Sequence, residues 1–419
     1  MFVHFGFNIA AAIAVAAGYR TRLTAAALGV GTLSLLLMEP SVYINHTYLY
    51  ALTALLLCLT PCGEAISLDV AAGRSSPRGS APAWCLYALR LQLGIVYVYS
   101  GIAKFDPDWL AALPLEIWLR SASGYPVIGP VFALSLLPHV LAWGGLFFDL
   151  LVVPGMLWRR TRAGVFAVAV AFHLTNVIVF GLGTFPWFAL AMTSLFFEPE
   201  TFRRIGFLAR RLPPDISPSG SLPSSATVVR DVDPHPTLAA RERSSRDRLQ
   251  ESLRAVAQDG RRSADERPVA LWLLVTLCIW FGIQLFLPLQ PLLYAGRASW
   301  TEEGHTFAWR MMLRTKTGSV SFEVRDPATG ETWTENAIGH TTRRQYLALI
   351  KRPELIRQYA HHLAETYAGR GRAGVEVRAR AICSLNGRAP RLLVDPRVNL
   401  AAERGRLSAY PWIRPEEPR

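Results

Sequence analysis

Residues 97–110, Tyr-Val-Tyr-Ser-Gly-Ile-Ala-Lys-Phe-Asp-Pro-Asp-Trp-Leu, join the end of a long apolar run to a charged turn. The run covers residues 85–102, about the length of a membrane helix. Lys104 follows it, and an ammonium near hydrocarbon either extends to water or loses its proton. A neutral lysine amine can act as a base or nucleophile. The stretch predicts a membrane helix with a candidate catalytic lysine; the alternative is a snorkelling anchor paired with Asp106 or Asp108.

The whole chain has the pattern of a polytopic membrane protein. Of its 419 residues, 51% are hydrophobic and 18% are charged, and the apolar residues form long runs between short basic loops. The runs predict membrane helices over residues 2–18, 24–39, 45–60, 84–103, 131–157, 163–181, 184–197 and 270–294. The net charge of +13 lies largely in loops beside these runs, so membrane orientation explains it and we expect no nucleic-acid partner.

Loop charges also give the runs a consistent orientation. Arginines follow the first, third, fifth and seventh runs, whereas the loops between them carry few basic residues. If each run crosses once, the arginine-rich loops are cytoplasmic. Lys104 and the start of the run at 45–60 then share the opposite face. We therefore expect an integral, multi-pass protein whose active site lies on the extracytoplasmic side.

Composition divides the chain into four predicted regions. They are a membrane domain (1–200), a basic disordered cytoplasmic linker rich in Pro, Ser, Arg and Asp (201–268), a last membrane helix (269–295) and an extracytoplasmic domain (296–419). In the last region, the patterns predict strands at 320–324 and 375–379, a turn at 326–330 and a helix at 353–368. The expected fold is a polytopic all-α membrane bundle of seven to eight membrane helices with a small extracytoplasmic α+β domain at the C-terminus.

Other polar side chains interrupt the apolar runs. Asn45 and His46 open one helix, where the alternative is an N-cap and an interfacial side chain. Asp149 lies deep in an apolar run and needs a cationic partner or a proton. His173, with Asn176 nearby, is as compatible with a structural polar core as with catalysis. Carboxyl, imidazole and amine groups in one dry bundle interior suit proton abstraction. The sequence has no cluster of metal ligands, and we expect no metal.

These residues carry a resemblance to the vitamin K-dependent γ-glutamyl carboxylase family, within the wider group with a horizontally transferred transmembrane (HTTM) domain. Residues 100–109 resemble the family's Ala-Gly-Val-Lys-Lys-Leu-Asp-Ala-Asp-Trp, whose second lysine, the catalytic base, falls on Lys104. Residues 44–50, Ile-Asn-His-Thr-Tyr-Leu-Tyr, resemble Asn-Asn-His-Ser-Tyr-Leu-Tyr. Further resemblances follow in the same order at residues 144–149, 172–176, 300–301, 309–312, 384–388 and 395–398. The chain looks like a bacterial-type homologue, which implies the bacterial inner membrane.

The resemblance implies an enzyme of the carbon-carbon lyase type, a peptidyl-glutamate carboxylase. It would couple oxygenation of reduced vitamin K to the epoxide with carboxylation of glutamyl residues, and use O2 and CO2 as co-substrates. Lys104 would be the base, with His46 as a hydrogen-bond partner that Asn45 orients. The implied substrate-binding residues are Trp300, Trp309, Met311, Met312, Lys316 and Arg388. The implied partners are membrane lipid and a glutamyl-containing peptide or protein.

Several positions depart from the family's pattern. Ala103 replaces the first lysine of its motif, and His305 replaces a tyrosine. Arg314 and Lys316 replace a histidine and an arginine. The family's first membrane helix is not found, so we expect Met1 to be a late start or the chain to be a fragment.

Three alternatives therefore stay open. The protein is a quinone epoxidase or oxygenase that carboxylates nothing, a quinone- or lipid-binding membrane protein without enzymatic activity, or an inactive remnant.

Overall fold

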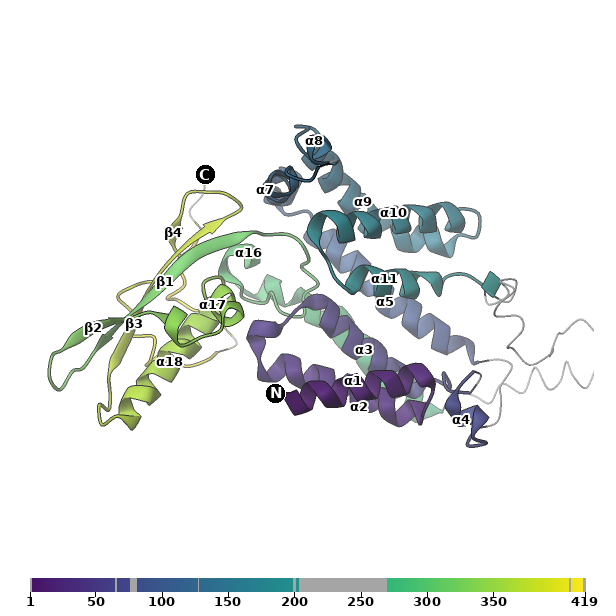
Figure 1. Ribbon diagram of the computed structural model, residues 1–419, viewed down its shortest axis with the longest axis horizontal. Coiled ribbons are helices and arrows are strands. Elements are labelled where there is room, and N and C mark those ends of the chain that lie inside the picture. The colour runs from purple at the N-terminus through teal and green to yellow at the C-terminus, as the bar shows by residue number, and fades with distance from the viewer. Residues whose placement is uncertain are drawn as a thin grey trace, which may run out of the picture.

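The computed structural model describes residues 2–64, 66–75, 81–126, 128–198, 201–202, 270–406 and 408–416. Apart from two residues, the predicted linker at 201–268 lies outside this part of the chain. The described residues form a helical bundle and, at one end of it, a domain with a sheet (Figure 1).

The bundle contains most of the long helices. They are α1 (Phe2–Ala17), α2 (Thr21–Met38), α3 (Asn45–Leu59), α5 (Ala83–Ala103), α9 (Leu137–Leu157), α10 (Arg162–Phe180), α11 (Phe185–Ser194) and α15 (Leu271–Phe286). Short helices between them are η1 (Pro40–Val42), α4 (Leu68–Ala71), α6 (Pro107–Leu110), α7 (Leu113–Ala122), α8 (Gly129–Phe132) and η2 (Leu287–Leu293). The run predicted from residue 131 becomes a helix only at Leu137, where Pro138 occupies a first-turn position that proline favours.

Within the described residues, five helices are long and apolar enough to cross a membrane: α2, α5, α9, α10, and α15 together with η2. This confirms a polytopic membrane protein. Helices α1 and α3 are apolar but have 16 and 15 residues, and α11 has ten, which is less than the roughly 20 residues of a full span. Large apolar side chains remain exposed on the outward faces of the bundle, for example Ile13, Leu151 and Ile279, as expected for helices that lie in lipid.

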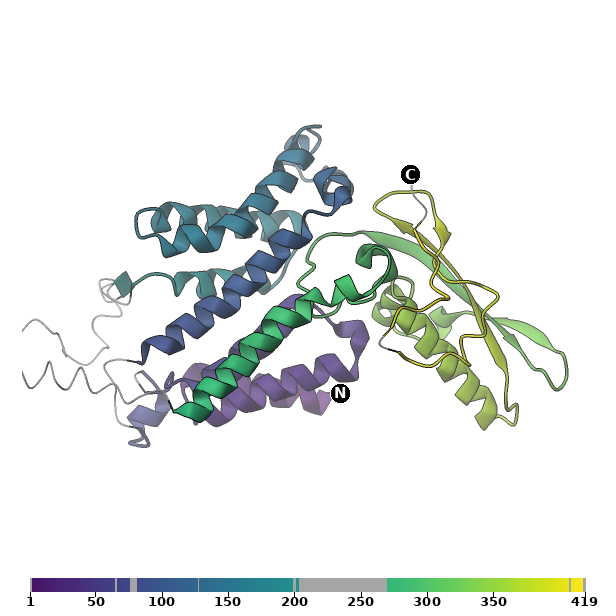
Figure 2. The same ribbon diagram turned by 180° about the vertical axis from the view of Figure 1, so that it is seen from behind.

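The bundle helices pack in a chain of neighbours. Helix α2 packs against α1 and α3, and α9 packs against α5 and α10. Figure 2 shows α15 beside α5, where the indole nitrogen of Trp280 donates to Gln92 Oε1 at 2.9 Å. Leu49, Leu56, Leu93 and Met156 are among the fully buried side chains of this core.

The outer domain, which follows η2, contains one antiparallel sheet. Its strands are β1 (Lys316–Arg325), β2 (Thr332–Glu335), β3 (Glu376–Leu385) and β4 (Arg391–Leu392), in the spatial order β2-β1-β3-β4. Its helices are α16 (Ala298–Thr301), η3 (Ala337–Gly339), α17 (Arg343–Leu349) and α18 (Pro353–Gly369). Phe322 and Val377, on the buried face of the sheet, share a core with Ile356 and Leu363 of α18. Both predicted strands, the turn and the helix at 353–368 are confirmed.

The outer domain lies at the opposite end of the bundle from the described basic loops, which follow α1, α4 and α9 (Figure 1). Helix α4 and the end of α11 lie at the end away from the sheet (Figure 1). At that end, Arg162 donates to Glu198 at 3.2 Å, and Arg74 donates to Asp69 at 2.9 Å. The arrangement agrees with the predicted grouping of loops.

Candidate active site

A cavity of about 730 Å³ lies between the bundle and the outer domain. Its walls come from α3, α5, α7, α9 and α10, from the segment at 305–314 and from the junction of α17 and α18. The cavity brings together these sequence-predicted residues: Asn45, His46, Lys104, Asp149, His173, Asn176, Met311 and Met312. All the bundle residues singled out from the sequence therefore face one space.

Lys104 is the only lysine in residues 1–295, and its side chain lines the cavity. It is the residue after α5, and its Nζ donates to Asp149 Oδ2 at 2.5 Å and to Ser100 Oγ at 2.9 Å. Lys104 and Asp149 are each 4% exposed, and the Trp109 ring lies 5.2 Å from the ammonium. Asp149 thus has the cationic partner that its burial demands, and Lys104 does not extend to water.

Gly101 makes this ion pair possible. A Cβ atom at Gly101 would lie 2.6 Å from the side chain of Leu150 and 3.3 Å from that of Asp149. The missing side chain therefore lets α9 approach α5 closely enough for the carboxylate to reach Lys104. A larger residue here would separate the two helices.

The imidazole of His173, on α10, lines the same cavity as this pair. Its Nε2 atom is 3.0 Å from the hydroxyl of Tyr97, a residue of α5 that the sequence analysis missed. Phe148 and Phe172, whose rings stack at 4.0 Å between centroids, flank the imidazole and line the cavity. The Tyr97–His173 contact supports a structural role for His173 beside its place in the cavity.

The start of α3 connects the cavity to the outer domain. Ile44 occupies the N-cap position, so the alternative in which Asn45 caps the helix is wrong. Asn45 instead accepts a hydrogen bond from the Tyr43 hydroxyl at 2.9 Å and donates to the Arg310 carbonyl at 3.5 Å. The His46 ring stacks on Phe185 with 5.7 Å between centroids. Both side chains line the cavity.

The outer end of the cavity is basic. We call this wall the basic rim; it consists of His305, Arg310, Arg314, Arg344, Lys351 and Arg352. Arg314 binds both carboxylate oxygens of Glu302, at 2.6 and 2.5 Å. Burial would raise the pKa of Glu302, but the Arg314 and Lys316 cations outweigh it and lower the pKa to about 2. Glu302 is therefore fully ionised and neutralises part of the rim.

Two other cations of the rim have no carboxylate partner in the described part of the chain. Among the described residues, no carboxylate forms an ion pair with Lys351 or Arg352; Arg352 donates instead to the Pro40 carbonyl at 2.6 Å and to Thr306 at 3.1 Å. Burial, and then the charge of Arg314, lower the pKa of Lys351. The same two causes hold the pKa of His305 well below 6.5. The rim thus has an excess of positive charge.

The backbone between Glu302 and Met312 is strained. Glu302, Phe307, Trp309 and Met312 have φ angles of 64°, 64°, 52° and 58°, a left-handed region that side-chain-bearing residues rarely adopt. The buried Trp309 ring stacks on Tyr48 of α3 with 5.1 Å between centroids. Such strain is common where a chain is held for function, and here it fixes Met311 and Met312 against the cavity.

Four of the implied substrate-binding residues lie away from the cavity wall. Trp309 is fully buried against Tyr48 and does not line the cavity. Trp300 donates to the Arg414 carbonyl at 2.8 Å. Lys316 is buried and donates to two carbonyls and to Glu302. Arg388 binds Asp108 and Glu416. The structure shows these residues in contacts within the outer domain and with the bundle, so their role in substrate binding stays a prediction.

The sequence analysis missed Tyr97, Arg310, Lys351 and Arg352 as site residues. Arg310 sits inside a quoted motif, and the basic pair 351–352 directly precedes the proline that starts α18. Nothing in their spacing distinguishes them from surface arginines. As for metals, the described residues contain no group of three or more His, Cys, Asp or Glu side chains that could hold an ion.

Two family models match the chain. Residues 1–200 match the HTTM domain, and residues 269–419 match the model described as vitamin K-dependent gamma-carboxylase, lumenal domain. No solved structure matches. The fold, the cavity and the first match define a membrane protein with an HTTM bundle. The two matches together cover more than four fifths of the chain, which belongs to the vitamin K-dependent gamma-carboxylase family.

Proposed function

We propose that the protein is a vitamin K-dependent carboxylase-like enzyme that couples oxygenation of reduced vitamin K to the epoxide with carboxylation of glutamyl residues. The observation that carries the proposal is the presence, in one cavity, of a buried lysine amine and of a basic rim that the described carboxylates neutralise only in part. Proton abstraction needs the first feature, and binding of a glutamyl carboxylate needs the second.

The cavity suits a quinone ring with an apolar tail. The stacked rings of Phe148 and Phe172 form a flat wall. Val140 of α9 and Val168 of α10 also line the cavity, yet they are 55% and 58% exposed on the outside of the bundle. The cavity therefore reaches the surface that lipid would cover. Reduced vitamin K, when bound, supplies together with O2 the strong base that removes a glutamyl γ-proton for CO2 to replace.

The chain's own residues would hold and move protons. Within the Lys104–Asp149 pair, whose Nζ and Oδ2 atoms are 2.5 Å apart, the shared proton can move to the carboxylate, and the neutral amine at Nζ would then accept a proton from a hydroquinone hydroxyl. Ser100 orients the amine from one side. His46 lines the same cavity, so its ring would donate a hydrogen bond to a quinone oxygen or accept one from a hydroquinone hydroxyl.

The basic rim would bind the glutamyl side chain. Lys351 and Arg352 are free of carboxylate partners among the described residues, and a substrate carboxylate would supply one. The rim lies at the outer end of the cavity and Lys104 at the bundle end, so the peptide would enter from the outer domain.

One assay separates the possible activities. Membranes that contain the protein are given reduced vitamin K, labelled CO2 and a Glu-containing peptide, and both epoxide and fixed label are measured, with membranes lacking the protein as the control. Epoxide together with fixed label supports the carboxylase. Epoxide alone would favour the oxygenase, and neither product, in a preparation that still binds the quinone, would overturn the proposed function.

We also propose that the cavity and the outer domain are extracytoplasmic. The described basic loops, which follow α1, α4 and α9, lie at the end of the bundle away from the sheet (Figure 1), and basic loops are cytoplasmic as a rule. A single cysteine at Ser224 should resist an impermeant thiol reagent in intact cells, and one at Thr329 should react. The reverse pattern would contradict this orientation.

A further inference from the structure

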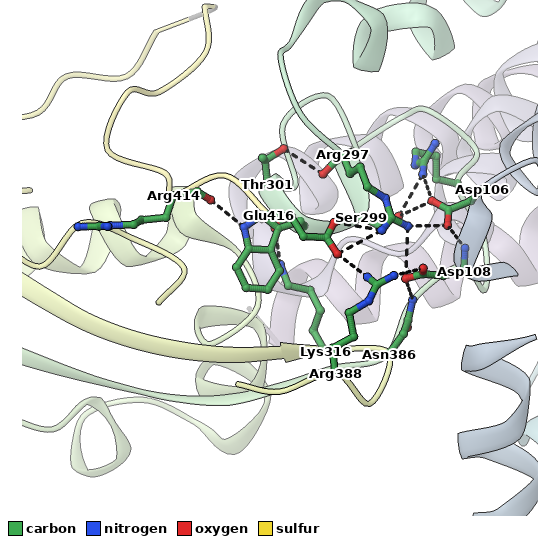
Figure 3. Close-up of polar contacts among 12 residues, drawn as sticks. Asp106, Asp108, Arg297, Ser299, Thr301, Lys316, Asn386, Arg388, Arg414 and Glu416 are labelled. Carbon is green, nitrogen blue, oxygen red and sulfur yellow. Dashed lines mark hydrogen bonds and ion pairs between the residues drawn. The ribbon is translucent and has the colours of Figure 1, made fainter. Parts of the chain in front are cut away.

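Two carboxylates follow Lys104 in the turn that ends α5. Asp106 caps α6, because its Oδ1 accepts a hydrogen bond from the backbone nitrogen of Asp108 at 3.0 Å. The side chains of Asp106 and Asp108 are 6% and 1% exposed. Neither carboxylate binds Lys104, although both are its nearest acidic residues in sequence. Both turn towards the outer domain (Figure 3).

Three arginines of the outer domain meet these carboxylates. Arg297 lies 2.7 Å from Asp106 and 3.3 Å from Asp108. Arg310 lies 3.5 Å from Asp106, and Arg388 binds Asp108. The network is completed by Glu416, which binds two of the arginines, and by Ser299 and Asn386, which donate to Asp106 and Asp108. We call these eight residues the interdomain clamp.

The charges of the interdomain clamp balance, and its two aspartates are buried. Three guanidinium groups face three carboxylates. Removing one member of a buried pair leaves the other without a counter-charge, which is strongly unfavourable. Separating the turn that carries Asp106 and Asp108 from these arginines would therefore cost much stability. Its position is set by the outer domain as much as by α5.

The same turn is part of the cavity wall. Lys104 precedes Asp106 by two residues, and Trp109, which follows Asp108, lies against the Lys104 ammonium and donates to the Ala142 carbonyl at 2.9 Å. Arg310 binds Asp106 and also lines the cavity. A shift of the turn would move Lys104 relative to Asp149 on α9.

We propose that Asp106 and Asp108 are positioning residues: by binding the outer-domain arginines they hold the end of α5 where the Lys104 amine faces Asp149. The proposal rests on the proposed function only for the chemical role of Lys104. Its test measures how well Lys104 is held, and not turnover, so the two proposals can fail separately.

The test is the rate at which Lys104 is reductively methylated by formaldehyde with cyanoborohydride as the reductant, in the full-length protein in membranes, followed by mass spectrometry. We expect Asp108→Asn to raise this rate on the order of tenfold, since loss of a buried ion pair favours local opening by at least that much. Arg388→Gln should have the same effect. Asp108→Glu, which keeps the charge, should restore most of the protection.

Asp69→Asn is the matched control. Asp69 is also a buried aspartate that binds an arginine beside a helix end, but it lies at the other end of the bundle. We expect it to leave methylation of Lys104 unchanged.

The double variant Asp108→Asn/Arg388→Gln removes both charges together, and so remains informative if a lone buried charge prevents accumulation. Its rate should not exceed that of either single variant, because both substitutions break one coupled contact. Unchanged methylation in the Asp108 and Arg388 variants, or an equal rise in Asp69→Asn, would overturn the proposal.

Discussion

The two ends of the cavity hold charge in different ways. At the bundle end, one cation, Lys104, faces one carboxylate, Asp149, and both are buried. At the outer end, Lys351 and Arg352 form no ion pair with a carboxylate of the described chain. A balanced pair in a dry site can pass a proton, whereas cations in excess attract an anion. Under the proposed function, proton chemistry and anion binding would therefore be separated along a single cavity, and we expect that each end can be disabled alone.

The largest effect should come from Lys104. We expect Lys104→Arg to lower epoxide formation by at least roughly a hundredfold, because a guanidinium keeps its proton and cannot act as a base. It should still accumulate, since the arginine can bind Asp149. Lys104→Ala should be equally inactive, and a small amine in solution should restore part of its activity. Near-normal epoxide formation by the arginine variant would remove Lys104 from the mechanism.

Asp149→Asn should be the most destabilising of these substitutions. It leaves a buried ammonium without its counter-charge, which costs about 3–5 kcal/mol. We expect a lower thermal unfolding midpoint for the solubilised protein and a large loss of epoxide formation. The double variant Lys104→Met/Asp149→Leu should recover the midpoint but no activity.

Glu198→Gln is the control for that experiment. Glu198 binds Arg159 and Arg162 at the far end of the bundle, where its side chain is 42% exposed, so its loss should cost under about 1 kcal/mol. An equal fall in midpoint for Glu198→Gln and Asp149→Asn would contradict the distinction between the buried pair and an exposed one.

The basic rim should affect peptide binding and leave epoxide formation intact. We expect Lys351→Ala to raise the KM for a Glu-containing peptide roughly tenfold or more, since a hydrogen bond to a charged group contributes about 1.5–3 kcal/mol. The kcat at saturating peptide should change little. Arg343→Ala, at the start of α17 and outside the cavity, should leave KM unchanged. If Lys351→Ala lowers kcat alone, the two ends do not divide the work as proposed.

The smallest effect is a pH dependence that comes from His305. Burial, and then Arg314, hold the pKa of folded His305 well below 6.5, so below that pH the unfolded chain binds a proton and the folded one does not. Stability should therefore fall as pH drops below 6.5, by up to about 1.4 kcal/mol per pH unit. Unfolding midpoints at pH 7.5 and 5.5 should differ less in His305→Gln than in the unchanged protein. Equal differences would show that folded His305 takes up a proton.

Much of the fold could be predicted from periodicity alone. Apolar runs gave the bundle helices, and alternation gave β1 and β3, because both patterns report which face of an element is buried. The number of full spans was less accessible. Helices α1, α3 and α11 are apolar yet short, and whether such a helix crosses depends on its neighbours and not on its own residues.

The site was predictable in its residues but not in its pairings. Asp149 was expected to need a cation, and only the alternative of a snorkelling anchor paired Lys104 with Asp106 or Asp108; the structure pairs Lys104 with Asp149. Closeness in sequence does not predict the partner of Lys104, because its side chain points back into the bundle, whereas the two aspartates lie past the end of α5. Lys351 and Arg352 became site residues only through the docking of the outer domain, which no local pattern reports.

The interdomain clamp also has a consequence for the order of events during synthesis. Asp106 and Arg297 are 191 residues apart, and Asp108 and Arg388 are 280 apart. The ribosome therefore makes α5 and Lys104 long before the arginines exist, and until then the two carboxylates lie beside Lys104 without these counter-charges. We expect the lysine to reach its final place late, once α15 has inserted and the outer domain has folded, so that a half-made chain carries no competent site.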